Sequence, residues 1–284
     1  MILQETYTLN NGVEIPKLGL GTWFISNDDV VEAVKAAVKL GYRHIDTAQA
    51  YQNEAGVGKG IRECGVPREE LFVVTKLAAE VKSYDEAVAS INGSLETMGL
   101  DYLDLMIIHS PKPWMKYQEE DRYFEGNKEA WRALEEAYKA GKIKAIGVSN
   151  FEKVDLENIL ESCTVKPMIN QVLAHISNTP FDLIDYAKEQ DILIEAYSPI
   201  GHGELFKNEQ IAEVAIKYNV SVPQLSIRYC IQLGLLPLPK TANPAHMENN
   251  AALDFTISNE DMETLKNMEQ IKDYGEASMF PVYQ

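Results

Sequence analysis

The stretch "FVVTKLAAEVKSYDEAVASINGSLETMGLDYLDLMIIHS", residues 72–110, contains one complete strand–helix–strand unit. Residues 72–77 and 104–110 are short apolar runs bounded by polar residues, which is typical of strands that are buried on both faces. The segment between them begins with Ser83, a residue that often caps a helix, and continues with helix-forming residues up to Gly99. The stretch therefore predicts two strands of a helix-covered sheet.

The same alternation extends in both directions along the chain. Candidate strands occupy 17–22, 44–48, 72–77, 104–110, 145–150, 168–172, 193–199 and 235–240. Candidate helices occupy 28–41, 54–64, 83–100, 127–142, 151–162, 180–190, 208–218 and 244–252, and a last amphipathic segment covers 258–271. Eight strand–helix units predict a closed (β/α)₈ TIM barrel, an α/β fold. Before them, "ETYTL", "NNG" and "VEIPKL" predict an N-terminal β-hairpin.

The domain organisation follows from length and composition. The chain has 284 residues, a usual length for one such barrel, and no Pro/Gly/Ser-rich linker divides it. We therefore expect a single domain over 1–284. The longest helix-poor connection is 110–126, and loops of that length in compact domains are usually functional or disordered.

Charge and cysteine content exclude several classes of function. The chain carries 43 acidic and 26 basic side chains, a net charge of −17, which disfavours binding to nucleic acid or an anionic membrane. No charged-then-apolar leader and no apolar run of 18 residues occur. Three cysteines lie far apart and form no CxxC motif, so we expect no metal site and a reducing, cytoplasmic location.

Polar residues stand where the predicted strands end. In a (β/α)₈ barrel the chemistry lies at these carboxyl ends, so Asp46, Lys76 and His109 should converge, with Tyr51 in the loop that follows 44–48. A lysine inside the apolar run "VVTKL" needs a carboxylate partner, and Asp46 is on the adjacent strand. Taken alone, Asp46 could simply cap a helix and Tyr51 could pack with its hydroxyl in water.

These four side chains favour acid catalysis at a carbonyl oxygen. A free tyrosine has a pKa of about 10, and a nearby ammonium should lower it. Asp46 would hold Lys76 charged, Tyr51 would donate a proton to the oxygen, and His109 would orient it by a hydrogen bond. A carbonyl that gains a proton at oxygen needs a hydride at carbon, so the site predicts a hydride donor.

The motifs "GLGTW", "HIDTAQAYQNE", "VVTKL", "LDLMIIHSP", "IGVSNF", "INQV", "AYSP" and "PLPKT" occur in the order and spacing of the aldo-keto reductases, which the chain resembles over nearly its whole length. The resemblance is greatest to microbial members such as 2,5-diketogluconate and aldehyde reductases. It implies a (β/α)₈ barrel that binds NADPH and reduces aldehydes and ketones, with Asp46, Tyr51, Lys76 and His109 as the catalytic tetrad. It also implies that Trp23 and Trp114 line the substrate pocket. The implied cofactor-binding residues are Thr22, Ser149, Asn150, Gln171, Tyr197, Ser198, Lys240, Thr241, His246 and Asn250.

The adenosine end departs from the family pattern. Members that favour NADPH commonly have an arginine where "KTANPAHMENN" places His246, and a glutamate where it places Asn249. Arginine grips phosphate with two parallel hydrogen bonds, whereas a neutral histidine does not. We therefore expect a weaker preference for NADPH than is usual, with NADH also possible.

Two other functions fit part of this pattern. A strand lysine also suits a Schiff-base aldolase that uses Lys76, and the superfamily includes non-catalytic nucleotide-sensing subunits. The "SN", Gln171 and Tyr197 set favours the reductase, which we expect to act on a small carbonyl compound as a monomer. The loop 110–126, the loop after 193–199 and the tail after Ile271 should set specificity, and the short tail predicts an open pocket. His44 is expected to pack inside the barrel; His175 and His202 are assigned no role.

Overall fold

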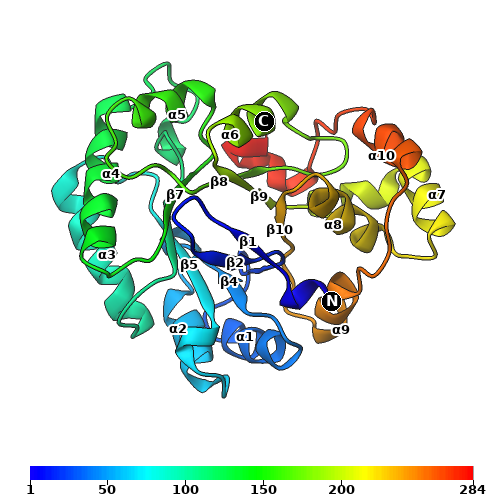
Figure 1. The fold of residues 1–284 in the computed structure, drawn as a ribbon, viewed down its shortest axis with the longest axis horizontal. Helices are drawn as coiled ribbons and strands as arrows, with labels where there is room; N and C mark the ends of the chain where they lie inside the picture. The colour runs from blue at the N-terminus through cyan, green and yellow to red at the C-terminus, as the bar shows by residue number, and fades with distance from the viewer. Residues whose placement is uncertain (284) are drawn as a thin grey trace.

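The computed structural model describes residues 1–283, which form a barrel of eight parallel strands surrounded by helices (Figure 1). Neighbouring strands pair in chain order, and the circle closes where Gly21 bridges Lys240 and its N–H donates to Pro239 O at 3.1 Å. The (β/α)₈ prediction is confirmed. The strands are β3 (Leu20–Gly21), β4 (His44–Asp46), β5 (Phe72–Leu77), β6 (Leu105–Ile108), β7 (Ile146–Ser149), β8 (Ile169–Leu173), β9 (Leu193–Tyr197) and β10 (Leu236–Leu238).

The helices turn apolar faces toward this barrel. In α4, for example, Ala130, Trp131 and Leu134 are buried against the strands, whereas Glu129 and Arg132 face outward and pair with each other. The helices are α1 (Asp29–Lys39), α2 (Glu54–Glu63), α3 (Tyr84–Met98), α4 (Phe124–Lys139), α5 (Lys153–Leu160), α6 (Phe181–Glu189), α7 (Glu209–Lys217), α8 (Val222–Gln232), α9 (Pro244–Ala251) and α10 (Asn259–Lys266).

The seventh strand–helix unit differs from the sequence prediction. Both α7 and α8 lie between β9 and β10, and α8, which the sequence prediction missed, packs against β10 and α9. The helix predicted at 208–218 is α7, an extra helix that contacts α8. Helix α8 has a clear start signal, because Ser221 and Gln224 form a capping box: the Gln224 N–H donates to Ser221 Oγ, and the Ser221 N–H donates to Gln224 Oε1.

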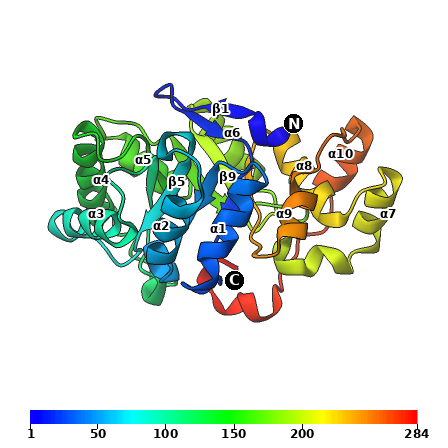
Figure 2. The ribbon, with the colours of Figure 1, turned by 90° about the horizontal axis from the view of Figure 1, so that it is seen from below.

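Different segments cover the two ends of the barrel. The predicted hairpin is present, with β1 (Thr6–Thr8) antiparallel to β2 (Glu14–Pro16). It lies over the amino-terminal ends of the strands, where Asn10 Nδ2 donates to Pro167 O and Asp191 O, each at 3.0 Å. Figure 2 shows the C-terminal segment at the opposite end, so this segment borders the carboxyl ends of the strands.

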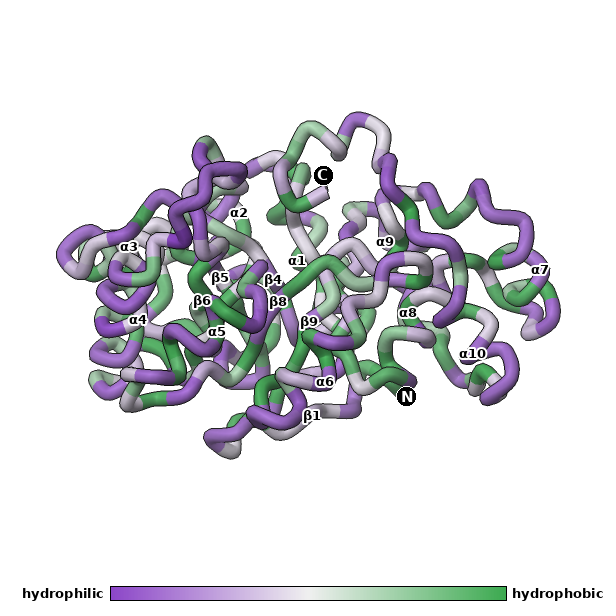
Figure 3. Tube along the Cα trace, turned by 90° about the horizontal axis from the view of Figure 1, so that it is seen from above, coloured by the Kyte–Doolittle hydropathy of each residue, from purple (hydrophilic) through white to green (hydrophobic). Residues whose placement is uncertain are grey.

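The core runs continuously through the strands and the inner sides of the helices. All six residues of β5 are buried, including the charged residue Lys76. Figure 3 shows hydrophobic chain around the strands in the middle of the molecule and hydrophilic chain in the outer loops and helix surfaces. No helix within residues 1–283 has the length and apolar character needed to cross a bilayer.

Candidate active site

A cavity of about 760 Å³ opens at the carboxyl end of the barrel. Its walls come from segments after most of the strands and from the C-terminal tail. Residues that the sequence analysis singled out supply much of the lining: Thr22, Trp23, Asp46, Tyr51, His109, Trp114, Ser149, Asn150, Gln171, Tyr197, Ser198 and Lys240. The predicted catalytic face of the barrel therefore coincides with the cavity.

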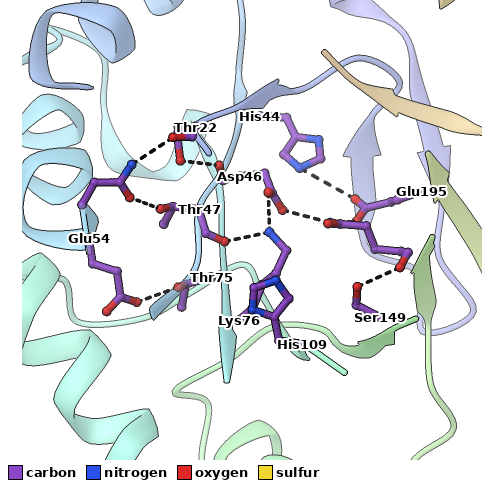
Figure 4. A network of polar contacts seen from close by, with 12 residues as sticks. Thr22, His44, Asp46, Thr47, Glu54, Thr75, Lys76, His109, Ser149 and Glu195 are labelled. Carbon is purple, nitrogen blue, oxygen red and sulfur yellow. Dashed lines mark hydrogen bonds and ion pairs between the residues drawn. The ribbon is translucent and has the colours of Figure 1, made fainter. Parts of the chain in front are cut away.

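A buried ion pair lies beneath the cavity. Lys76 of β5 is fully buried and donates to the Asp46 carboxylate and to Thr47 O, the latter at 2.8 Å (Figure 4). Asp46 ends the adjacent strand β4, so the parallel pairing of β4 and β5 brings the two charges together. Removing either partner would leave an uncompensated buried charge, which costs about 3–5 kcal/mol.

Tyr51 and His109 lie above this pair. Tyr51 ends a short 3₁₀ turn, Gln49–Tyr51, and its ring centroid is 5.0 Å from Lys76 Nζ. His109 directly follows β6, and its ring lies edge-on to that of Tyr51 with the centroids 5.6 Å apart. The four residues of the predicted tetrad thus converge at the floor of the cavity.

The pKa of Tyr51 contradicts the sequence-based expectation. Burial raises it well above its usual value, and the negative charge of Asp46 raises it further. The expected lowering by Lys76 was wrong because Asp46 already balances the ammonium charge. Tyr51 is therefore a protonated phenol, which can donate a hydrogen bond and then a proton to an oxygen that gains negative charge.

His109 is a neutral imidazole in this site. Burial, and then the positive charge of Lys76, lower its pKa well below the usual value. Its Nδ1 is buried and has no partner among residues 1–283, so Nε2 is the ring nitrogen left to meet a ligand in the cavity. A neutral His109 with its proton on Nε2 can donate a hydrogen bond without adding a second positive charge.

The residues assigned to the nicotinamide form a connected row. Ser149 and Gln171 are register partners in β7 and β8, and Ser149 Oγ donates to Gln171 O at 2.8 Å. The hydroxyl of Tyr197 donates to Asn150 Oδ1 at 2.7 Å, and Asn150 has a left-handed backbone with φ 60°. Gln171 donates from Nε2 to Asp46 Oδ2 at 3.0 Å, which leaves Gln171 Oε1 as an acceptor. An acceptor beside an aromatic ring fits a nicotinamide carboxamide.

The residues assigned to the adenosine end lie apart from this row. Lys240 borders the cavity, whereas His246 and Asn250 lie on α9, outside the cavity lining. Thr241 is buried and accepts from the Asn243 N–H at 3.0 Å, and His246 is exposed. Only an elongated ligand could contact both groups, as the extended dinucleotide implied by the resemblance would.

The C-terminal tail borders the cavity, as expected of a segment that sets specificity, through aromatic residues that the sequence did not single out. Tyr283 is buried, and its hydroxyl lies 2.8 Å from Ser198 Oγ. Its ring stacks on Trp23 with the centroids 6.3 Å apart, and Phe280 meets Trp23 edge-on. The tail is short, as the sequence shows, and its aromatic side chains line one side of the cavity.

Two further residues at the site were not anticipated. His202, which was assigned no role, borders the cavity with its Nε2 3.2 Å from Ser198 Oγ. Glu195 is fully buried in β9 and contacts Gln171. A signal for Glu195 exists in the sequence, because an ionisable residue inside the apolar run "LIEAYSP" is as unusual as the lysine in "VVTKL". His44 packs inside the barrel as expected and is fully buried.

The position of Lys76 disfavours Schiff-base chemistry. Its ammonium is fully buried, is held by Asp46 and Thr47, and does not border the cavity described for residues 1–283. An imine-forming lysine must reach the carbonyl carbon as a neutral amine, and Asp46 keeps Lys76 charged.

The site combines a phenol and an imidazole above a buried ion pair with an aromatic ring and an amide acceptor beside them. In a (β/α)₈ barrel, this set of groups defines a nicotinamide-dependent oxidoreductase of carbonyl compounds. A sequence profile described as the Aldo/keto reductase family matches residues 17–270. The chain belongs to this family and is an NADP-dependent oxidoreductase.

Similar proteins agree with this assignment. The chain is 46% identical to a glyoxal reductase of Bacillus subtilis over 265 residues, which cover 93% of this chain and 92% of the relative. It resembles the crystal structure of an aldo/keto reductase from Brucella melitensis with a TM-score of 0.86 at 38% identity, over 92% of this chain and 98% of that one. A Bombyx mori aldo-keto reductase in complex with NADP matches with a TM-score of 0.85 at 32% identity, over 98% of both chains.

Proposed function

We propose that Tyr51 is the general acid of a reversible carbonyl reduction and that His109 orients the carbonyl oxygen. The observation that carries this proposal is the edge-on contact of the Tyr51 and His109 rings, 5.6 Å apart, at the floor of the cavity. A carbonyl oxygen placed between them receives a hydrogen bond from each. NADPH, when bound, would supply the hydride to the carbonyl carbon while Tyr51 donates the proton to the oxygen, which would give an alcohol and NADP⁺.

Lys76 and Asp46 act through Tyr51. When Tyr51 gives up its proton, the phenolate faces the ammonium of Lys76, whose Nζ is 5.0 Å from the ring centroid. This charge stabilises the phenolate only as it forms, because Asp46 balances it beforehand. Solvent then returns the proton to Tyr51 after the alcohol leaves.

We infer that the substrates are aldehydes and ketones with an apolar or aromatic body. Trp23, Trp114, Phe280 and Tyr283 give the cavity aromatic walls, and Met115 stands almost fully exposed at its border. Such walls give a large apolar contact but few hydrogen bonds for a polyhydroxylated sugar. The similarity to a glyoxal reductase also supports small dicarbonyl compounds as substrates.

We propose that the cofactor extends from the nicotinamide row to the residues assigned to its adenosine end. Ser149, Asn150 and Gln171 would hold the carboxamide, and Tyr197 would stack on the ring. Thr22 and Ser198 would contact the dinucleotide, and Lys240, Thr241, His246 and Asn250 would contact its adenosine end. The three free cysteines, Cys64, Cys163 and Cys230, fit the reducing cytoplasm in which we propose the enzyme acts.

Replacing Tyr51 with phenylalanine tests the assignment. The Tyr51→Phe variant should bind NADPH as the wild type does, since only the hydroxyl is lost. Reduction of an aromatic aldehyde should slow by about 10²–10⁴, the usual contribution of general acid catalysis. Cofactor binding is followed by tryptophan fluorescence and turnover by NADPH absorbance. A variant with nearly full activity would show that another group donates the proton.

A further inference from the structure

Glu195 is a buried carboxyl group in the nicotinamide row to which no role has been assigned above. It lies on β9 as the register partner of Gln171 on β8, and its side chain has no exposed surface. Glu195 Oε2 accepts from Gln171 Nε2 at 2.8 Å. Its other oxygen, Oε1, has no hydrogen-bond partner among residues 1–283 and lies 3.8 Å from His44 Nε2.

Two carboxyl groups therefore flank the same end of the Gln171 amide. Asp46 Oδ2 and Glu195 Oε2 lie 3.0 and 2.8 Å from the same amide atom of Gln171. Asp46 is ionised in its pair with Lys76, so it can only accept hydrogen bonds. The amide end between them must be the NH₂ group, and the carbonyl oxygen of Gln171 must point the other way, into the cavity that Gln171 borders.

We propose that Glu195 is a positioning residue that, together with Asp46, fixes the Gln171 amide with its oxygen toward the nicotinamide carboxamide. This inference rests on the cofactor placement proposed above. A carboxamide NH₂ needs an acceptor, and a rotated Gln171 would oppose it with a second NH₂ donor. Fixing Gln171 thus selects one rotation of the carboxamide about its bond to the ring.

The surrounding charges fit this role. Burial, and then the charge of Asp46, raise the pKa of Glu195 to about 8, and burial lowers the pKa of His44 to about 3. Both groups are therefore neutral at pH 7. The proton of Glu195 belongs on Oε1, toward the Nε2 lone pair of His44, which leaves Oε2 as the acceptor for Gln171. The other charged groups that face Glu195 are Asp46 and Lys76, whose charges cancel each other.

An NADP⁺ analogue tests the inference without measuring turnover. In 3-acetylpyridine adenine dinucleotide phosphate, a methyl group replaces the carboxamide NH₂ and cannot use the Gln171 acceptor. Wild-type enzyme should bind NADP⁺ roughly five- to tenfold more tightly than this analogue, the usual effect of one hydrogen bond. In Glu195→Met, which keeps the side-chain length but accepts no hydrogen bond from Gln171, Asp46 alone still holds the amide. The ratio of the two dissociation constants should therefore fall to about half of its wild-type value or less.

Two variants separate positioning from stability. Glu195→Gln can present its carbonyl oxygen to Gln171 and its NH₂ to His44, so it should keep the wild-type ratio. Glu54→Met removes another buried carboxyl group, one that accepts from Thr75 Oγ1 at 2.6 Å and does not touch Gln171. It should lower the melting temperature and leave the ratio unchanged. Dissociation constants come from quenching of tryptophan fluorescence.

The outcomes are distinct. A lowered ratio of dissociation constants in Glu195→Met, with the wild-type ratio retained in Glu195→Gln, supports the inference. An unchanged ratio in Glu195→Met, or a lost ratio in Glu195→Gln, overturns it while the proposed function stands. If Glu195→Met does not fold, Glu195→Leu, which also removes the acceptor for Gln171, takes its place with the same expected ratio. A wild-type protein that binds neither nucleotide overturns the proposed function and this inference with it.

Discussion

Single buried charges organise the catalytic end of this barrel. Lys76 donates hydrogen bonds to Asp46 and Thr47 (Figure 4). Asp46 in turn accepts from Gln171, so all four residues form one connected network. Glu195 joins the network as a neutral acid, so the cluster as a whole carries no net charge. Such a balance allows several ionisable groups to share a dry interior at modest cost in stability.

The raised pKa of Glu195 has a consequence for stability. The folded protein keeps this proton up to about pH 8, whereas an unfolded glutamate loses it near 4.5. Between these values the folded state binds more protons, so stability is fully present below about pH 4.5 and is lost as the pH rises. The loss approaches about 1.4 kcal/mol per pH unit.

Glu195→Gln removes this proton linkage. The variant should gain about 3 kcal/mol over the wild type between pH 5.5 and 7.5, because its amide does not titrate. Urea unfolding of both proteins at pH 5.5, 6.5 and 7.5 measures the change. A stability difference that stays constant over this range would show that Glu195 is ionised in the folded state.

His246 is the residue at which cofactor preference is expected to differ from the family pattern. It is exposed on α9, so a substitution there should leave the core intact. His246→Arg should raise the preference for NADPH over NADH at least tenfold, since an arginine can hold the 2′-phosphate with two charge-assisted hydrogen bonds.

The kcat/KM values for the two cofactors measure this preference, and His246→Gln, which adds no charge, serves as the control. A wild-type preference for NADPH of order 10³, about 4 kcal/mol, would refute the idea that His246 weakens it.

Some residues of the site could be predicted from the sequence, and others could not. Asp46, Tyr51, Lys76 and His109 were predictable because an ionisable residue in an apolar strand is costly and needs a nearby partner. Glu195 gave the same signal, but its partner Gln171 is apparent only from the register of β8 and β9. The pKa of Tyr51 was predicted in the wrong direction, because burial is a property of the whole fold and outweighs one neutralised ammonium.

At the scale of elements, strands were easier to predict than the segments that cover them. Strand β5 matches its predicted range, since a fully buried strand must be apolar along its length. The sequence prediction missed helix α8, although Ser221 and Gln224 form a capping box at its start. The pattern of one helix after each strand was already satisfied by α7 in the seventh unit. The position of the tail depends on contacts with distant loops, such as that of Tyr283 with Ser198, which the sequence does not reveal.

The tail occupies a position that the cofactor is expected to need. The hydroxyl of Tyr283 is bonded to Ser198 Oγ, a group expected to contact the dinucleotide. We predict that a cofactor bound at Ser198 takes the place of this bond. Tyr283→Phe should tighten NADPH binding by roughly two- to tenfold, because the bond no longer has to be broken.

Tyr274→Phe is a matched control for the tail. Its hydroxyl bonds His175 and Asn178 and lies in the same aromatic cluster, but it does not touch Ser198. NADPH titrations followed by tryptophan fluorescence compare the two variants with the wild type. Weaker binding by Tyr283→Phe would mean that the tail hydroxyl assists the cofactor rather than opposing it.

At the scale of the whole molecule, the barrel is one closed circle. One hydrophobic core links β3 with β10 and includes buried residues of the barrel strands and of each of the helices α1 to α10. The seam where the circle closes is narrow, because a Cβ on Gly19 would stand 2.5 Å from Leu238 Cδ2 and 2.8 Å from His44 Nδ1. This continuity supports the proposal of a single domain over the chain.

A single domain predicts that strain at the seam lowers the stability of the whole barrel at once. Gly19→Ala should lower the free energy of unfolding by about 1–3 kcal/mol through overpacking. Gly93→Ala is the matched control: its Cβ meets no atom within 4 Å, and it lies inside α3, where alanine is favoured by about 1 kcal/mol.

Urea unfolding followed by both far-UV circular dichroism and tryptophan fluorescence should give one coincident transition for each variant. The transition should shift to lower urea concentration in Gly19→Ala and to higher urea concentration in Gly93→Ala. The midpoints should not depend on protein concentration, as expected of a monomer. Two separated transitions in Gly19→Ala would mean that the barrel consists of halves that unfold independently, since only the part next to the seam would then lose stability.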